Sequence, residues 1–145
     1  MKYDIVTTTK FNDYAVELKN YLGDELSCES SLIVVEDDLT YVAKVVEISN
    51  QIAKVHREGF ALIMIDETGA LGFVASGKVK YMITAQCSDE HSAHMTREHN
   101  GAVGLALGAN ITAIPEAKLI LKRFVEEKFA AGRHMVRIDM LDDMA

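Results

Sequence analysis

The sequence lacks most of the features that mark secreted, membrane-spanning or disordered proteins. It has no tryptophan, one proline and two cysteines among 145 residues. Cys28 and Cys87 lie far apart and form no pair at metal-ligand spacing, which favours a reduced cytoplasmic location over a disulfide framework. No apolar run reaches the roughly 20 residues of a membrane span. The N-terminal residues MKYDIVTTTKFNDY have too short an apolar run for a signal peptide.

Positive charge is also scarce. The chain has 15 lysines and arginines against 22 aspartates and glutamates, a net charge of −7. A nucleic-acid partner requires a basic surface that neutralises phosphates, so this balance argues against one, although a local group of cations can still bind a small phosphate. A hydrophobic content of 49% in 145 residues fits one globular domain with a continuous core.

Short apolar runs alternate with segments whose apolar residues recur at helical spacing. The predicted strands are 3–8, 31–35, 60–65, 82–86 and 103–107, and the predicted helices are 14–22, 36–55, 69–76, 88–99 and 115–128. We expect Gly23 to end the first helix and Ser88 to cap the fourth. Strands that alternate with helices over short connections imply a parallel sheet with helices on both faces. The predicted fold is a single domain (1–145), an α/β/α three-layer sandwich with a five-stranded, Rossmann-like parallel sheet.

The polar stretch after the fourth predicted strand is the first candidate site. Three of the five histidines lie in it, His91, His94 and His99, and Asn100 follows the last. In open α/β sheets, ligands bind where strands end and helices begin. His99 fits a general acid/base with the Asn100 amide beside it, or else a surface residue at a helix end. His91 and His94 are one turn apart, but no third ligand is evident, so we expect no metal site.

The segment DETG at 66–69 is the second candidate. Asp66 follows an apolar strand, where such sheets place site residues, but an aspartate there fits a cap of the next helix equally well. Thr68 and Gly69 add a hydroxyl and an unobstructed backbone N–H, which suit an anion. The segment lacks the spacing and the lysine of a P-loop, so it is not specific alone.

Two arginines in the C-terminal tail form the third candidate. Arg133 and Arg137 are four residues apart, so on a helix both project to one side. Two guanidinium groups placed in this way can bind a phosphate. The alternative is that both form ion pairs with the many surface carboxylates.

Three motifs together carry a family resemblance: CSDEHSAHMTREHN at 87–100, GAVGLALGANI at 101–111 and AAGRHMVRIDML at 130–141. They resemble the ribose-5-phosphate isomerase B / galactose-6-phosphate isomerase family, whose pattern is C-S-D-x-x-S-A-x-x-[ST]-R-x-H-N, a strand ending in L-G, and G-G-R-H-x-x-R. The match is ungapped from about residue 60 to the C-terminus, weaker over 2–22 and poor over 28–58. The ending R-H-x-x-R-[IV]-D-M-L is most similar to the A-type subunit of galactose-6-phosphate isomerase.

The resemblance implies a dimer or tetramer that isomerises a phosphorylated sugar through an enediol, without metal or cofactor. By position, His99 would be the ring-opening acid/base and Asn100 a substrate ligand. Arg133 and Arg137 would bind the phosphate. Thr68 would lie in the loop that stabilises the enediolate.

The chain departs from the family at positions that matter for catalysis. Complete members have a cysteine, the proton-transferring base, where this chain has Asp66, and an Asp-His pair where it has Thr8 and Thr9. A phosphate-binding arginine is replaced by Asn110, and a loop glycine by Leu71.

These departures leave three readings open. The favoured one is a subunit that converts galactose 6-phosphate to tagatose 6-phosphate with a cysteine-bearing B-type partner, to whose site it supplies His99 and Asn100. Its tail from about residue 130 would then pack on a neighbouring subunit. The second is a non-catalytic sugar-phosphate-binding or scaffolding protein. The third is a self-sufficient isomerase with Asp66 as base, which requires surroundings that favour proton uptake near neutral pH.

Overall fold

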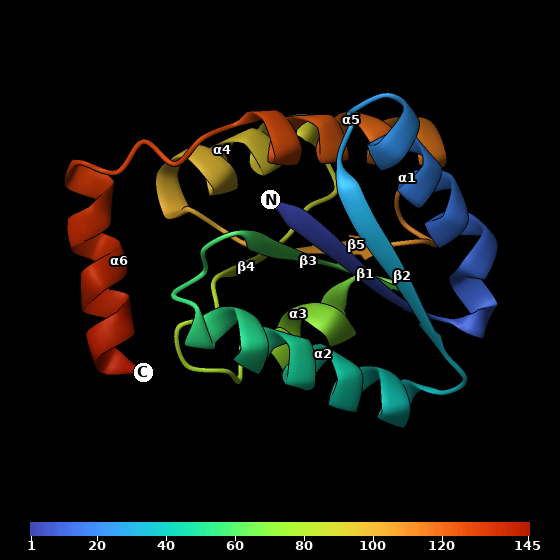
Figure 1. Ribbon diagram of the computed structural model, residues 1–145, viewed down its shortest axis with the longest axis horizontal. Coiled ribbons are helices and arrows are strands. Elements are labelled where there is room, and N and C mark those ends of the chain that lie inside the picture. The colour runs from blue at the N-terminus through green and yellow to red at the C-terminus, as the bar shows by residue number, and fades with distance from the viewer.

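Five parallel strands form one sheet in the computed structural model, which covers residues 1–145 (Figure 1). In the order β2-β1-β3-β5-β4, they are β1 (Lys2–Thr8), β2 (Glu29–Val35), β3 (Phe60–Asp66), β4 (Thr84–Gln86) and β5 (Gly104–Gly108). The helices are α1 (Asn12–Asp24), α2 (Asp38–Lys54), α3 (Ala70–Ser76), α4 (Glu90–Asn100), α5 (Ile114–Glu126) and α6 (Arg133–Met144), with a 3-10 turn at Thr9–Phe11. The predicted α/β class and its five-stranded parallel sheet are confirmed.

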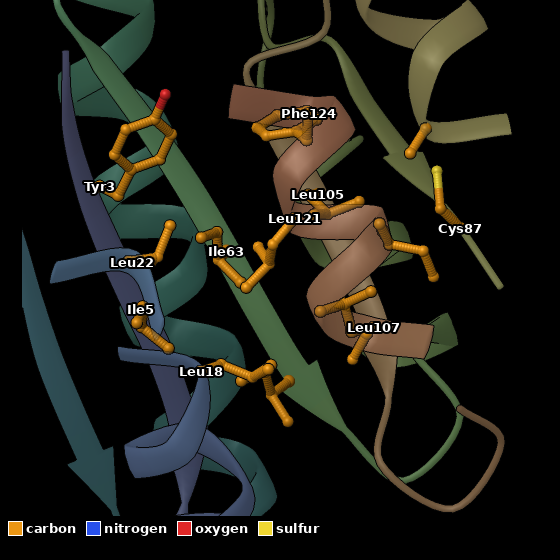
Figure 2. Close-up of a cluster of buried hydrophobic side chains, with 14 of the residues drawn as sticks. Tyr3, Ile5, Leu18, Leu22, Ile63, Cys87, Leu105, Leu107, Leu121 and Phe124 are labelled. Atoms are coloured by element: carbon orange, nitrogen blue, oxygen red, sulfur yellow. The ribbon is translucent and has the colours of Figure 1, made fainter. Parts of the chain in front are cut away.

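Helices cover both faces of the sheet. The alternation of side chains along β3 shows why: Ile63 and Ile65 pack toward α1, α4 and α5, whereas Leu62 and Met64 pack toward α2 and α3. All four side chains are fully buried, as expected for a central parallel strand. Figure 2 shows the first of these two layers, in which side chains of α1 and α5 close over β1, β3 and β5.

Three predicted boundaries were wrong. Gly23 lies inside α1, because its conformation there is helical and the chain leaves the helix two residues later. Asp89, not Ser88, caps α4, since its carboxylate accepts the Ser92 N–H at 2.7 Å. β4 is limited to Thr84–Gln86: the apolar residue Met82 is buried under the sheet but bonds to the preceding turn, not to the ladder.

The last helix, α6, stands apart from the two layers (Figure 1). Its inner side holds the buried His134 and Ile138, and Asp142 makes a two-bond ion pair with Arg57 at 2.9 and 3.0 Å. Four apolar side chains on its other faces are more than half exposed: Val136, Met140, Leu141 and Met144. None of the helices in the chain combines the length and apolar character that crossing a bilayer requires.

Candidate functional site

At the carboxyl end of the sheet, the predicted residues Asp66, Thr68 and Gly69 form one group, here called the carboxyl-end cluster. The Asp66 carboxylate is 5% exposed and accepts four hydrogen bonds. One oxygen accepts from the backbone N–H groups of Thr68 (3.2 Å) and Gly69 (2.7 Å). The other accepts from the Gly72 N–H (2.8 Å) and the Tyr41 hydroxyl (3.0 Å). Asp66 therefore caps the start of α3 and holds it to α2.

Tyr41 and Gly72 make this arrangement possible. Tyr41 is fully buried. Burial, reinforced by the negative charge of the Asp66 carboxylate, raises the pKa of the Tyr41 hydroxyl, so this group stays protonated and donates a hydrogen bond to Asp66. A Cβ on Gly72 would lie 2.6 Å from the Tyr41 hydroxyl and 2.8 Å from the Met64 Cβ. Gly69 has a φ of 81°, which a glycine adopts without strain. The loop is thus closed tightly around its carboxylate.

A cavity of about 220 Å³ lies over the carboxyl-end cluster. Its lining includes three carboxylates, from Asp38, Asp66 and Glu67, against a single cation, Lys10. Asn110 points its amide at Glu67 (3.4 Å) and adds no charge. Because like charges repel, this cavity disfavours a phosphate.

At the amino end of the sheet, the remaining predicted residues His99, Asn100, Arg133 and Arg137 form the amino-end cluster. His99 and Asn100 end α4, and the two arginines begin α6. Asn100 borders a cavity of about 240 Å³ under α6. The connection that leads into α6 is tied to α4 there by a hydrogen bond from the Ala130 N–H to the Glu98 carbonyl (2.8 Å).

Neither arginine of this cluster has a carboxylate partner, and Arg137 donates its one hydrogen bond to His134. Both arginines are exposed, and neither takes part in an ion pair of the chain. They lie in the first two turns of a 12-residue helix, whose dipole favours negative charge at this end. The cluster therefore offers two guanidinium groups and a helix N-terminus to a phosphate.

One residue of the amino-end cluster was not predicted. His134 is 7% exposed, and its ring stacks on that of His99 with the centroids 4.3 Å apart and the planes 12° apart. Arg137 donates a hydrogen bond to His134 Nδ1. Burial, then the cations His99, Arg137 and Arg133, lower the His134 pKa. Its place in the motif GRHMVR was a usable signal, whereas nothing in the sequence pointed to Tyr41 as the partner of Asp66.

The two clusters lie at opposite ends of the strands. β3 ends at Asp66, whereas α4 ends at Asn100, just before the start of β5. Since β3 and β5 are parallel and a seven-residue strand spans roughly 20 Å, one chain does not bring Asp66 to His99. The expectation that His99 and Asn100 lie where strands end was wrong, because α4 carries them back to the other end of the sheet.

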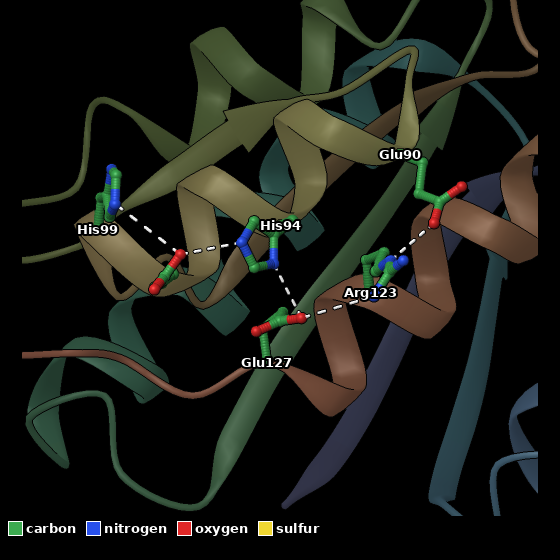
Figure 3. A network of polar contacts seen from close by, with 6 residues as sticks. Glu90, His94, His99, Arg123 and Glu127 are labelled. Atoms are coloured by element: carbon green, nitrogen blue, oxygen red, sulfur yellow. Dashed lines mark hydrogen bonds and ion pairs between the residues drawn. The ribbon is translucent and has the colours of Figure 1, made fainter.

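His94 and Glu90 connect α4 to the second half and end of α5 (Figure 3). His94 lies 2.9 Å from a Glu98 oxygen and 2.8 Å from a Glu127 oxygen, and Arg123 pairs with Glu90 at 2.6 Å. The His94 contacts are ion pairs only while the imidazole is protonated. No three His, Cys, Asp or Glu side chains are grouped to hold a metal ion. These contacts give His94 a structural role in joining the two helices.

Neither cysteine is placed to act as a base. Cys87 is 2% exposed within the core layer of Figure 2, and burial, with a smaller effect of Asp89, raises its pKa to about 12. Burial also raises the pKa of Cys28. A thiol with a raised pKa is seldom a thiolate at neutral pH.

The doubly wound parallel sheet, with exposed arginines at its amino end, defines a small α/β protein. The chain belongs to the Ribose/Galactose Isomerase family, whose sequence pattern matches residues 8–141.

Similar proteins include enzymes of two named activities. The galactose-6-phosphate isomerase subunit LacA of Streptococcus mutans is 40% identical over 127 residues, covering 88% of this chain and 87% of that protein. The subunit LacA of Clostridium acetobutylicum is 36% identical over 99% of both chains. Among solved structures, ribose-5-phosphate isomerase B of Clostridium thermocellum aligns with a TM-score of 0.85 and 25% identity over 99% of this chain and 97% of its own. Ribose-5-phosphate isomerase B of Mycoplasma genitalium, solved with bound ribulose-5-phosphate, shares the fold. It aligns with a TM-score of 0.88 and 20% identity over 99% of this chain and 95% of its own.

Proposed function

We propose that the chain is the A-type subunit of an aldose–ketose isomerase that interconverts galactose 6-phosphate and tagatose 6-phosphate. In this proposal a B-type subunit supplies the cysteine base, and the active site forms between the two chains. The names of the LacA relatives support the substrate and the subunit role.

The observation that carries the proposal is the separation of the two clusters. Asp66 stands where complete family members have the base, but its carboxylate is buried and takes four hydrogen bonds. His99 and the two arginines lie at the other end of the strands and face outward. A chain built in this way has one half of a site to offer, and a second chain has to provide the other half.

The amino-end cluster has a role for each residue. Arg133 and Arg137 bind the sugar phosphate. The protonated His99 ring gives its proton to the ring oxygen of the sugar while a solvent water accepts the proton of the anomeric hydroxyl, so the bond between C1 and the ring oxygen breaks and the ring opens. The Asn100 amide orients a substrate oxygen. The base of the partner then removes the C2 proton and returns it to C1 through the enediol.

The same proposal gives a use to the exposed face of α6. Val136, Met140 and Leu141 are each more than half exposed. We expect this face to pack on the neighbouring subunit, which would bring the amino-end cluster to that subunit's carboxyl-end loop. The assembly would be a dimer or tetramer.

A self-sufficient enzyme is the alternative, with Asp66 as base and Thr68 and Gly69 stabilising the enediolate from their own loop. The four hydrogen bonds that Asp66 accepts argue against this alternative, because they fix the carboxylate within its own loop. The remaining reading is a non-catalytic sugar-phosphate-binding or scaffolding protein, and the acidic lining of the carboxyl-end cavity favours the scaffolding form of it.

An assay of isomerase activity distinguishes the partnered subunit, the self-sufficient enzyme and the non-catalytic protein. The pure chain, and then the chain with a cysteine-bearing B-type subunit, is assayed with galactose 6-phosphate and ribose 5-phosphate. Turnover only with the partner, lost by about 100-fold or more in His99→Ala, is the expected result. His91→Ala, a surface histidine on the same helix, is the matched control and should keep the parent rate.

The other outcomes contradict the proposal. Turnover by the pure chain would show that no partner is needed, and would favour Asp66 as the base. An absence of turnover in both samples, with the fold intact, would favour the scaffolding protein.

A further inference from the structure

Two imidazoles from different helices stack at the amino-end cluster. His99 comes from the last turn of α4 and His134 from the first turn of α6, and their rings lie 4.3 Å apart and within 12° of parallel. The His99 side chain is 34% exposed, whereas His134 is 7% exposed. The buried ring therefore forms a flat platform on which the accessible ring lies.

The hydrogen bond to Arg137 decides which nitrogen of His134 carries the proton. A guanidinium group can only donate, so His134 Nδ1 has to accept with its lone pair. The ring is then neutral, with its proton on Nε2.

The charges around His134 agree with a neutral ring. His99 and Glu98 face it from α4, and Arg133 and Arg137 from its own helix, so three of the four neighbours are cations or can become cations. Two protonated rings at 4.3 Å would repel each other. Of the two rings, His99 is the one with a carboxylate within 4 Å, because its Nε2 lies 3.8 Å from a Glu98 oxygen.

We infer that His134 is a positioning residue for His99, holding the His99 ring in the plane from which it exchanges a proton with the sugar ring oxygen. This inference rests on the proposed function. It also links the two tasks of the cluster, because Arg137 both binds the phosphate and holds the His134 platform.

The kinetic test compares two substitutions in the complex with the B-type subunit. His134→Ala removes both the flat ring under His99 and the acceptor for Arg137, so kcat should fall about tenfold or more and KM should rise. His134→Phe keeps a flat ring but loses the acceptor for Arg137, so kcat should return to within about threefold of the parent while KM rises. Equal loss of kcat in both variants, or none in His134→Ala, would overturn the inference.

A spectroscopic test on the pure chain does not depend on activity. ¹⁵N NMR of the imidazoles at pH 6.5, with His134 assigned by the signal missing in His134→Phe, should show Nδ1 unprotonated and Nε2 protonated. A doubly protonated His134 at that pH would overturn the inference. If the complex has no isomerase activity but the His134 ring is neutral and stacked, the proposed function fails and the proton assignment stands.

Discussion

The two ends of the sheet carry polar side chains in opposite states. At the carboxyl end, each carboxylate oxygen of Asp66 accepts two hydrogen bonds, and the residue is buried. At the amino end, Arg133 and Arg137 have no carboxylate partner and are exposed. A polar group whose hydrogen bonds are complete within the chain stabilises the fold, whereas one without a partner is available to a ligand. The carboxyl-end cluster therefore stabilises the fold, whereas the amino-end cluster keeps exposed guanidinium groups, to which we assign the ligand in our proposal.

The largest effect on stability is expected from Asp66→Ala. It would leave the Tyr41 hydroxyl and three backbone N–H groups without an acceptor, so the free energy of unfolding should fall by roughly 3 kcal/mol or more. Urea unfolding measures this. Glu67→Ala, at the next and exposed position, is the control and should change stability by less than about 0.5 kcal/mol. A loss below about 1 kcal/mol for Asp66→Ala would show that the carboxyl-end cluster does not hold the fold.

Gly72→Ala tests how tightly this cluster is closed. The added Cβ would meet the Tyr41 hydroxyl at 2.6 Å and the Met64 Cβ at 2.8 Å, both in the buried interior. Overpacking of this kind should destabilise the chain by roughly 1–3 kcal/mol, measured by the same urea titration. Gly23→Ala is the control, because nothing lies within 4 Å of its Cβ position. A stability loss no greater than that of the control would contradict the tight packing described above.

Arg133→Gln tests whether the amino-end cluster contributes to binding and not to stability. The side chain is exposed and unpaired, so the free energy of unfolding should stay within about 0.5 kcal/mol of the parent. Loss of a charged phosphate contact should raise KM of the partnered enzyme about tenfold, with a smaller effect on kcat. Steady-state kinetics give both values. An unchanged KM, or a stability loss like that of Asp66→Ala, would remove the distinction between the clusters.

The smallest expected effect is a loosening of α6 in acid. His134 is neutral in the docked helix and its pKa is lowered from 6.5, so protonation favours the undocked state. Docking should be complete above pH 6.5 and weaken as the pH falls through the lowered value. Hydrogen exchange of residues 133–144 at pH 7.5 and 5.0, corrected for the intrinsic rates, measures it. His134→Phe should remove the pH dependence, and equal protection of the parent at both pH values would contradict the account.

Much of the fold could be predicted because its signals are local. The run FALIMI identified β3 to within one residue, and the alternation of strands and helices predicted the parallel sheet. Errors arose where an apolar residue packs outside the ladder, as Met82 does. The helix α6, which carries Arg133 and Arg137, was not among the predicted helices; their four-residue spacing said only that they would share one side if a helix formed there. The partnership of Asp66 with Tyr41 and the stack of His99 on His134 could not be predicted, because each joins residues from separate helices or strands.

The central claim is that the amino-end cluster performs chemistry and the carboxyl-end cluster does not. The most direct measurement compares kcat of the partnered enzyme for His99→Gln and Asp66→Asn, both assayed where the proteins are folded. We expect His99→Gln to lose about 100-fold or more and Asp66→Asn to stay within about threefold of the parent. A collapse of the rate in Asp66→Asn, with His99→Gln still active, would place the base in this chain and contradict the account.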